Sequence, residues 1–499
     1  MKIKELIKVL DLRKVPANLV NIEVEGIAYD SRKIKENFIF VALKGTSSDG
    51  HQFINDATAR GAKIIIVNRK SAVLPSDVSE IMVDDTRKAL HALATEFYGH
   101  PSKKLKLVGI TGTNGKTTTS YIIKRIFEHT GNKCGLVGTI SYQVGERTIS
   151  STNTTPESLD LQKLLADMID EGCRAAVMEV SSHGIEQGRI SKLHFDAGIL
   201  MNIAPHEHLD YHKNFRNYLH AKMKFFSHYL KESEKEKKVG IINCDDAYAG
   251  HFIKCLRKNS INCMTFGKNS ADIRLLDYGV QRDGNRLTVE INGKKMDFRT
   301  KIRGLGNIYN TLAGIAFSVS QNIQPEVLKE SLMLISSVPG RFESVNEGQN
   351  FDVIVDYAHT HHALTNLLRS AKELNPGRII LVFGCGGDRD RSKRPLMGNV
   401  AVRMADIVFI TSDNPRSENP EDIIREVERG IPFYLRKKYV SIPDRKRAIR
   451  EAISMAGEND CVLIAGKGHE TFQIMKNTVI PFDDREEAKR AIKALKNGI

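Results

Sequence analysis

A glycine-rich run, GITGTNGKTT at residues 109–118, has the residue types that bind phosphate groups. It follows a short apolar stretch and precedes an amphipathic helical pattern, which is the context of a P-loop. Backbone N–H groups at the start of such a helix bind phosphate oxygens. Lys116 would neutralise the β- and γ-phosphates, and the Thr117 hydroxyl would bind Mg²⁺. Ile110 stands where the usual pattern has its first glycine, and a glycine-rich turn that binds nothing is the alternative.

A second group of polar residues suits a divalent metal ion beside the phosphates. The run MEVSSHG at 178–184 ends an apolar strand, and NIAPHEHLDYH follows at 202–212. Glu179 and the His, Asp and Glu residues of the second run are side chains that bind cations. Any one of these histidines, taken alone, is more often structural. Neither an N-K-x-D guanine motif nor an apolar strand ending in Asp-Glu accompanies the loop.

The elements that must position these residues fall into three blocks, which we place at 1–100, 101–338 and 339–499. Each block mixes strand and helix patterns, such as AKIIIV at 62–67 and a helix at 86–98 in the first. Residues 101–104 are interpreted as a polar linker and residues 338–340 as a second hinge. Alternation of strands with helices predicts α/β domains with parallel sheets.

Composition excludes several classes of protein. The chain has 499 residues, a net charge of +14 and 7 cysteines that form no C-x-x-C pair. Few, irregularly spaced cysteines favour a reduced, cytoplasmic protein without a disulfide framework. The longest apolar runs are far below the ~20 residues that cross a bilayer. The basic residues are dispersed and lack a nucleic-acid-binding pattern, so we expect neither a membrane nor a nucleic acid as partner.

Further short motifs occur before and after the phosphate loop and the metal-binding runs. They are YxxAK at 218–222, GNxxN at 306–310, GRFE at 340–343 and DYAHT at 356–360, with DSR at 30–32 and DGH at 49–51 near the start. Together with TGTNGKT, MEVSSHG and HEHLDYH, they closely resemble the Mur ligase family, which makes amide bonds with ATP in peptidoglycan synthesis. The resemblance covers essentially the whole chain. It implies an N-terminal UDP-binding α/β domain, a central P-loop ATPase domain and a C-terminal Rossmann-like domain that binds the amino acid.

The run DNPR at 413–416 resembles family members that add meso-2,6-diaminopimelate to UDP-N-acetylmuramoyl-L-alanyl-D-glutamate. Diaminopimelate carries a second carboxylate at its far end, and a guanidinium binds a carboxylate through two parallel hydrogen bonds. Lysine would leave Arg416 unpaired, and sites built to hydrogen-bond a missing group reject the analogue by roughly 10⁴-fold or more. Taken alone, DNPR is also typical of a proline-fixed turn after a strand.

The resemblance further implies roles for individual residues. The residues matched to ATP binding are Gly112, Thr113, Asn114, Gly115, Lys116, Thr117, Thr118, Asn307, Arg341, Asp356 and His359. Those matched to the UDP-muramoyl dipeptide are Ser31, Thr46, Asn153, Thr154, Thr155, Ser181, Gln187 and Arg189. Those matched to diaminopimelate are Arg389, Asp413, Asn414, Pro415, Arg416, Gly466 and Glu470. The diaminopimelate group follows predicted strand ends, where α/β sheets bind ligands.

The catalytic set implied by the family is Lys116, Glu179, His208 and Lys222. Mg²⁺ would be held by Thr117, Glu179, His208 and Lys222, with Lys222 carbamylated; from the residues alone, Lys222 is an ordinary exposed helical lysine. Two positions depart from the family pattern: His361-His362 follow DYAHT, and Thr46 replaces a histidine of some relatives. We expect a monomer. The alternatives are a lysine-adding or folylpolyglutamate-type ligase, or a P-loop nucleic-acid motor.

Overall fold

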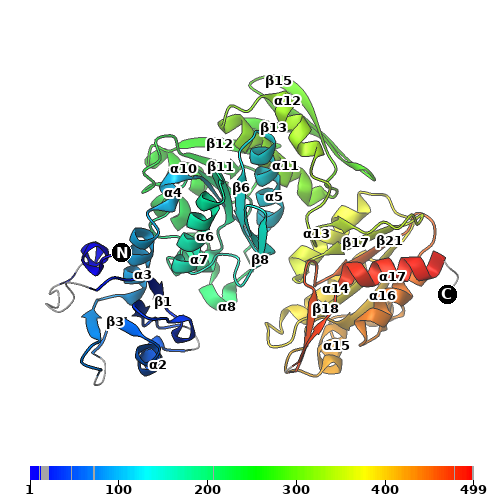
Figure 1. Ribbon diagram of the computed structural model, residues 1–499. Coiled ribbons are helices and arrows are strands. Elements are labelled where there is room, and N and C mark those ends of the chain that lie inside the picture. The colour runs from blue at the N-terminus through cyan, green and yellow to red at the C-terminus, as the bar shows by residue number, and fades with distance from the viewer. Residues whose placement is uncertain are drawn as a thin grey trace.

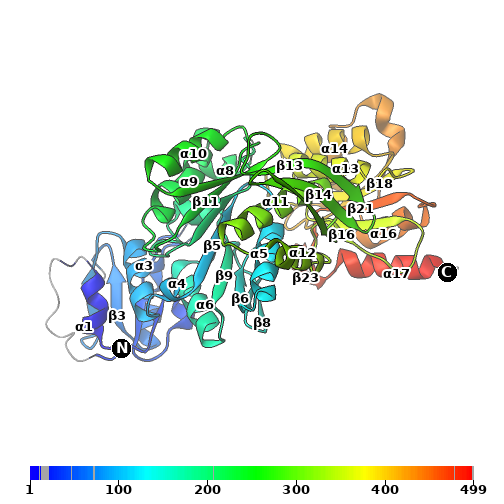
Figure 2. The same cartoon turned by 90° about the horizontal axis from the view of Figure 1, so that it is seen from above.

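The computed structural model describes residues 1–10, 12, 22–45, 48–70, 74–205, 207–476 and 478–496. Sheets of four, eleven and six strands follow one another along the chain, and a two-stranded hairpin comes last. Figures 1 and 2 show three bodies in a row, with the central sheet between the N-terminal and C-terminal ones. The boundaries at 1–100, 101–338 and 339–499 stay predictions.

The N-terminal body is a parallel sheet in the order β1-β2-β3-β4. Alternate residues of β3 point into two small cores, one shared with α3 and one with α2. Helix α3 begins after Asp85, whose carboxylate accepts the N–H groups of Arg87 and Lys88. The elements are α1 (Ile3–Leu6), β1 (Gly26–Ala28), β2 (Phe38–Val41), α2 (Ile54–Ala59), β3 (Ala62–Val67), β4 (Ser79–Met82) and α3 (Thr86–Phe97).

The segment interpreted as a polar linker is instead a short helix, α4 (Pro101–Lys104). Proline suits the first helical turn because its φ is already helical and its missing N–H would have no partner there. Pro101 and Ser102 are buried, and the Ser102 hydroxyl accepts a hydrogen bond from the His194 N–H at 3.2 Å. The connection to the central body is therefore packed against it.

The central sheet has the order β15-β14-β13-β12-β11-β10-β5-β9-β6-β7-β8. Its centre is parallel, as predicted, while β14 and β15 at one edge and β7 and β8 at the other add antiparallel pairs. The strands are β5 (Lys106–Thr111), β6 (Cys134–Val137), β7 (Ser141–Val144), β8 (Arg147–Ser150), β9 (Ala175–Glu179), β10 (Ala197–Leu200), β11 (Val239–Asn243), β12 (Asn262–Gly267), β13 (Ile273–Gln281), β14 (Gly284–Ile291) and β15 (Lys294–Thr300).

Two cores cover the faces of this sheet because successive strand residues point to opposite sides. Val108 and Ile110 of β5 face the core that holds α5, α11 and α12, whereas Leu107 faces the core of α6, α9, η5 and α10. The helices are α5 (Lys116–His129), α6 (Ser158–Asp170), α7 (Ser182–Glu186), α8 (Leu209–His212), α9 (Phe215–Lys224), the π-helix η5 (Phe225–Leu230), α10 (Ala249–Lys258), α11 (Leu305–Ser320) and α12 (Pro325–Met333).

The C-terminal body has a six-stranded sheet in the order β16-β17-β21-β18-β19-β20, parallel except at β16. Helices α13, α14 and α15 cover one face, and α16 and α17 cover the other. The elements are β16 (Glu343–Ser344), β17 (Asp352–Asp356), α13 (His361–Lys372), β18 (Ile379–Cys385), α14 (Lys393–Met404), β19 (Ile407–Ser412), α15 (Pro420–Glu428), η6 (Phe433–Lys438), β20 (Tyr439–Ser441), α16 (Arg445–Ser454), β21 (Cys461–Ala465), β22 (Phe472–Met475), β23 (Thr478–Pro481) and α17 (Asp484–Lys496).

A fully buried ion pair fixes the carboxyl ends of two strands in this body. The Arg445 guanidinium binds both oxygens of Asp484 at 2.7 Å and donates to the backbone oxygens of Ser412 and Ala465 at 3.3 and 3.0 Å. Ser412 ends β19 and Ala465 ends β21. The ion pair therefore fixes the positions from which the segments after β19 and β21 begin.

The central and C-terminal bodies are joined by polar contacts. Arg303 donates to Asp352 at 2.9 Å and to Ser344 at 3.0 Å, across the chain connection.

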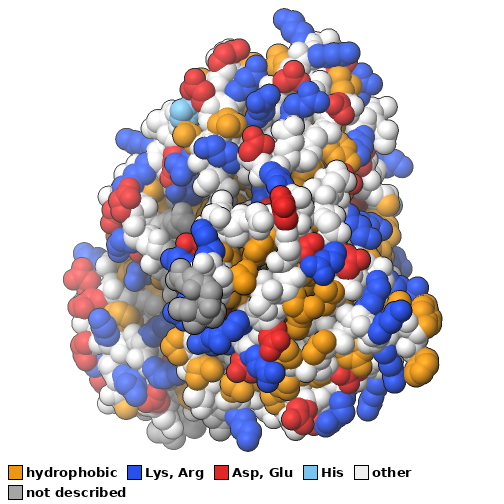
Figure 3. Space-filling model, turned by 90° about the vertical axis from the view of Figure 1, so that its right-hand side faces the viewer, with side chains coloured by type: hydrophobic (Ala, Val, Ile, Leu, Met, Phe, Trp, Pro, Cys, Tyr) orange, Lys and Arg blue, Asp and Glu red, His pale blue; other side chains and the backbone are white. Residues whose placement is uncertain are grey.

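Lys and Arg side chains are interspersed with Asp and Glu over the C-terminal side, as the dispersed charges of the sequence predict (Figure 3). Over the described part of the chain, no helix combines the length and apolarity needed to cross a bilayer.

Candidate active site

The glycine-rich run forms a loop between β5 and α5, the strand–loop–helix geometry of a P-loop. Gly112 has φ +148° and Gly115 has φ +87°, and a Cβ on Gly115 would lie 2.4 Å from Asn310 Oδ1. Both positions therefore require glycine. Ile110 lies inside β5 and is fully buried, so the missing glycine falls where the chain is still an ordinary strand.

Lys116 lies over this loop. Its Nζ donates to the backbone oxygens of Gly112 at 2.8 Å and Thr113 at 2.9 Å. Burial lowers the pKa of Lys116 below its ordinary value, and Arg341 adds to that effect. A phosphate on the loop would offer this lysine a stronger acceptor than the two carbonyl oxygens.

Thr117 and Glu179 are in direct contact, so both side chains could reach one metal ion. The Thr117 hydroxyl donates to Glu179 Oε2 at 3.1 Å, and Glu179 is 1% exposed at the end of β9. Thr139, which lies outside the predicted motifs, donates its N–H to Glu179 Oε1 at 2.9 Å and its hydroxyl to Oε2 at 3.0 Å. A hydroxyl and a carboxylate are oxygen ligands of the kind Mg²⁺ takes, so this donor set fits the ion.

Lys222 is not the exposed helical lysine that its sequence alone suggests. It is 1% exposed, and its Nζ donates to Thr111 Oγ1 at 3.3 Å and to the Gly112 carbonyl at 3.0 Å. That carbonyl also accepts from Lys116. Burial, with a smaller contribution from Lys116, lowers the pKa of Lys222 well below its ordinary value. Two charged ammonium groups on one carbonyl would repel each other.

His208 lies beside the Lys222 site. Its ring packs 5.8 Å from the ring of Tyr218, and the Lys222 Nζ lies 5.1 Å from that same ring. Burial and the nearby lysines lower the pKa of His208 to about 3, so its imidazole is neutral and able to bind a metal. In the described ranges, no three His, Cys, Asp or Glu side chains form a ready-made cation group.

Most of the residues matched to the muramoyl dipeptide gather beside Glu179. The Thr155 hydroxyl donates to the Glu179 carbonyl at 2.9 Å and to Ser181 Oγ at 3.1 Å. Arg189 donates to the Thr155 carbonyl at 2.7 Å and to Gln187 Oε1 at 2.9 Å. The Thr154 and Thr139 hydroxyls are 3.0 Å apart, and the Asn153 carbonyl accepts from Tyr142 at 2.7 Å.

Ser31 and Thr46, matched to the UDP end, are not part of this group. Ser31 begins a short 3-10 helix in the N-terminal body and is buried. Thr46 lies outside the described residues. The N-terminal body meets the central one through a hydrogen bond from the Tyr29 hydroxyl to Asp160 of α6.

The residues expected to close over ATP come from both sides of the second hinge. Arg341 donates to Thr117 Oγ1 at 3.2 Å, which places a C-terminal guanidinium at the P-loop. Asn307 accepts from Asn310 at 2.7 Å, and Asp356 accepts the Phe342 N–H at 2.7 Å. His359 bonds the Tyr357 carbonyl through Nδ1 at 2.8 Å.

The residues that depart from the family pattern also lie at this contact. His362 is at the start of α13, and its Nδ1 lies 3.4 Å from the Asn114 amide nitrogen of the P-loop. His361 begins α13 after Thr360, whose hydroxyl caps the helix. The two histidines are therefore accommodated in a regular helix that faces the nucleotide loop.

The diaminopimelate group assembles at the carboxyl ends of β18, β19 and β21. Asn414 donates to Glu470 Oε2 at 2.8 Å, and a Cβ on Gly466 would lie 2.5 Å from Asp413 Oδ2. Pro415 is buried, and Arg416 has φ +53°. A Cβ on Gly386 would lie 3.0 Å from Arg416 Nη1 and 3.8 Å from Arg389 Cγ, so the two arginines flank one point.

Lys467 is a further member of this group, which the sequence motifs do not predict. Lys467 is 0% exposed, and its Nζ donates to Asn414 Oδ1 and to Glu470 Oε2, both at 3.1 Å. It fixes the orientation of the Asn414 amide because a cation accepts no hydrogen bond. The available signal was its place directly after Gly466, but the sequence does not show that its side chain turns inwards.

Comparisons with known proteins identify the family of this chain. The family descriptions "Mur ligase family, catalytic domain", "Mur ligase middle domain" and "Mur ligase, glutamate ligase domain" match residues 23–98, 110–318 and 340–468. The UDP-N-acetylmuramoyl-L-alanyl-D-glutamate–2,6-diaminopimelate ligase of Clostridium tetani (strain Massachusetts / E88) is 41% identical over 499 residues, 99% of this chain and 100% of that one.

Solved structures share this fold. A UDP-N-acetylmuramoyl-L-alanyl-D-glutamate–2,6-diaminopimelate ligase covers 99% of both chains with a TM-score of 0.70 and 30% identity. The MurF ligase from Thermotoga maritima in complex with ADP covers 95% of this chain and 98% of that one, with a TM-score of 0.65 and 19% identity. The chain belongs to the Mur ligase family, whose members are ATP-dependent ligases, and the predicted family and fold class are confirmed.

Proposed function

We propose that this ligase uses ATP to join meso-2,6-diaminopimelate to UDP-N-acetylmuramoyl-L-alanyl-D-glutamate. The observation that carries the proposal is the group of charges at the ends of β18, β19 and β21, where Arg389 and Arg416 flank Gly386. Diaminopimelate presents a carboxylate and an ammonium at its far end. Two guanidiniums suit the carboxylate, and Asp413 with the Asn414–Glu470 pair suits the ammonium.

In the proposed reaction, the γ-carboxylate of D-Glu takes the γ-phosphoryl group of ATP, and an amine of diaminopimelate then displaces phosphate from the acyl phosphate. The protein positions the reactants and neutralises charge, as in other phosphoryl transfers. Lys116 and the loop N–H groups would bind the transferring phosphoryl group. Mg²⁺, when bound, would neutralise phosphate charge, with Thr117 and Glu179 holding one ion and His208 a second.

A carbamate on Lys222 belongs to the same proposal. Its support is geometric: a buried amine shares the Gly112 carbonyl with Lys116, and the Lys222 Nζ and the His208 ring lie 5.1 and 5.8 Å from the ring of Tyr218. A neutral amine adds CO₂ and loses a proton to give an anionic carbamate. That group would replace a repelling cation with a carboxylate-like ligand for Mg²⁺.

The same proposal includes roles for Arg189, Thr155 and Arg341. Arg189 and Thr155 lie next to Glu179, where the D-Glu carboxylate of the dipeptide would meet the γ-phosphate of ATP. Arg341 would close over ATP from the C-terminal side, because it already contacts Thr117. A monomeric state, a cytoplasmic location and the lack of a nucleic-acid partner stay predictions.

The experiment that tests the function is phosphate release with ATP, Mg²⁺ and UDP-N-acetylmuramoyl-L-alanyl-D-glutamate, with meso-diaminopimelate or L-lysine added in parallel. We expect release with diaminopimelate alone. Release with lysine alone would keep the ligase chemistry and overturn the assignment of the amino acid. Phosphate release stimulated by nucleic acid in the absence of both amino acids would favour a motor instead.

We expect Arg416→Lys to raise the KM for diaminopimelate by about 10- to 100-fold and to change the KM for ATP by less than about 3-fold. A lysine keeps the charge but loses the planar pair of donors, and a charge-assisted hydrogen bond contributes about 1.5–3 kcal/mol. Steady-state kinetics with each substrate varied in turn measures the effect. Arg403→Lys, an exposed position in α14, is the matched control, and equal changes in both KM values would contradict the carboxylate contact.

A further inference from the structure

The arginines that flank Gly386 sit on two loops that are bonded along their length. We call residues 386–392, after β18, the first loop and residues 413–419, after β19, the second loop. The Gly387 N–H donates to the Asn414 carbonyl at 2.9 Å, and Arg416 Nη1 donates to the Gly387 carbonyl at 2.7 Å. A Cβ on Gly387 would lie 1.9 Å from the Pro415 carbonyl oxygen. The two backbones are therefore in direct contact.

A buried arginine forms hydrogen bonds that link both loops to helices α14 and α15. Arg394, in the first turn of α14, is 0% exposed. Its Nη2 donates to the Gly386 carbonyl of the first loop at 3.1 Å and to Glu418 Oε1 of the second loop at 2.8 Å. Its Nη1 donates to Glu418 Oε2 at 2.9 Å and to Glu426 of α15 at 2.8 Å.

Glu418 of the second loop also binds the first loop. Its Oε1 also accepts the Asp388 N–H at 2.6 Å, and the Ser417 hydroxyl beside it donates to Asp388 Oδ1 at 2.6 Å. The hydrogen bond from Arg394 is the largest cause that lowers the pKa of Glu418 to about 2, so this carboxylate is charged at neutral pH. Arg389 follows Asp388 directly, and Arg416 lies two residues before Glu418.

We propose that Arg394, acting through Glu418, positions the two loops so that Arg389 and Arg416 face the same ligand carboxylate. Arg394 is a positioning residue for the amino acid, and the inference rests on the proposed function of these two arginines. Arg416 Nη1 and Arg389 Cγ both border Gly386, and two guanidiniums directed at one carboxylate would repel each other unless their loops were held in place. Holding them together in advance lowers the cost of binding the carboxylate.

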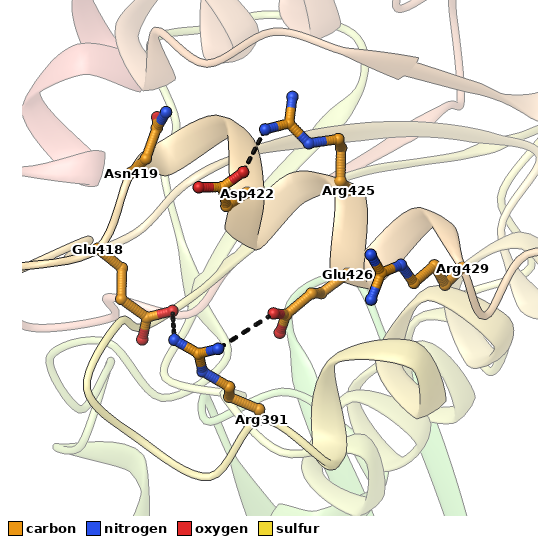
Figure 4. A pocket seen from close by; sticks show the side chains of 7 residues that line it. All are labelled: Arg391, Glu418, Asn419, Asp422, Arg425, Glu426 and Arg429. Carbon is orange, nitrogen blue, oxygen red and sulfur yellow. Dashed lines mark hydrogen bonds and ion pairs between the residues drawn. The ribbon is translucent and has the colours of Figure 1, made fainter.

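The geometry requires an arginine at this position. Four contacts in three directions, to Gly386, Glu418 and Glu426, use the planar fork of donors, which a lysine ammonium cannot reproduce. Arg391 provides an internal comparison. It reaches Glu418 at 2.9 Å and Glu426 at 3.6 Å but is 63% exposed (Figure 4). Exposed ion pairs contribute little, so we expect Arg391 to share the two glutamate partners of Arg394 without its positioning role.

The test compares Arg394→Lys with Arg391→Lys in the full-length enzyme. We expect Arg394→Lys to raise the KM for diaminopimelate by about 10- to 100-fold, because small misplacements of binding groups have effects of this size. The KM values for ATP and the UDP-linked substrate should change by less than about 3-fold. Arg391→Lys should change all three by less than about 2-fold. Glu418→Gln keeps the acceptor for Asp388 and weakens the Arg394 contact, so it should shift the same KM in the same direction.

The KM values of the Arg394→Lys enzyme support or contradict the positioning role of Arg394. A folded Arg394→Lys enzyme with an unchanged KM for the amino acid, or with equal rises for all three substrates, would overturn the inference. If Arg394→Lys does not fold, as circular dichroism would show, Glu418→Gln decides in its place. Wild-type enzyme assayed with diaminopimelate and with L-lysine separates the two claims. A lysine-specific wild type removes the proposed substrate, while a selective effect of Arg394→Lys on the KM for lysine would still support the positioning role.

Discussion

Replacing Lys222 by alanine is expected to lower kcat by about 10²- to 10³-fold while the protein stays folded. The size is that of removing one electrostatic group from a transition state. Lys222 lies between the P-loop carbonyl of Gly112 and the ring of Tyr218. As a carbamate it would hold Mg²⁺ next to the transferring phosphoryl group. A small carboxylic acid such as formate or acetate should restore part of the activity, because it can occupy the space that alanine leaves and offer the same oxygens.

The matched control is Lys224→Ala, on the same helix but half-buried and beside Tyr229 rather than the P-loop. It should keep wild-type activity. The carbamate itself is measured by ¹³C NMR of enzyme incubated with ¹³C-bicarbonate, with Lys222→Ala as the reference. Burial lowers the pKa of Lys222 well below its ordinary value, which favours the neutral amine that reacts with CO₂. Unimpaired activity of Lys222→Ala, or the same carbamate signal in both proteins, would disprove the modification.

The second large effect is expected for Lys116→Ala, which should reduce kcat by about 10³-fold or more. A cation placed on the transferring phosphoryl group can be worth 10³- to 10⁵-fold in such reactions. In the free enzyme the Lys116 ammonium is held by the Gly112 and Thr113 carbonyls, 2.8 and 2.9 Å away, so it is already directed at the loop. Single-turnover phosphate release measures the step that this residue would assist.

Lys106→Ala is the control for this variant. Lys106 is exposed at the start of β5 and donates to Gln321 at 3.1 Å, away from the loop. It should turn over ATP at the wild-type rate. ATP binding to Lys116→Ala, measured by calorimetry, distinguishes a loss of chemistry from a loss of the whole nucleotide site. Full activity of Lys116→Ala would remove the P-loop from the mechanism.

Much of the molecule was predictable from local patterns. The apolar run before residue 111 and the amphipathic pattern after residue 115 predict β5 and α5, because the periods of burial in strands and helices are fixed by backbone geometry. The positive φ values of Gly112 and Gly115 explain why glycine marks the loop. Parallel packing at the centre of the sheet follows from alternation of strands and helices, whereas the antiparallel edge strands depend on which chain segment meets the free edge.

The sequence by itself determined the chemistry of this protein: which residues could bind phosphate, metal and a carboxylate, and in what order they occur. Tertiary structure alone decided which of them meet. The sequence pattern indicates a solvated helical position for Lys222, yet packing of α9 buries this side chain against the P-loop. The sequence pattern of residues 101–104 predicts a linker, yet these residues form helix α4, in which Pro101 and Ser102 are buried. No local pattern predicts that the side chains of Arg394 and Lys467 are buried, because burial of a charge depends on partners that lie far away in the chain.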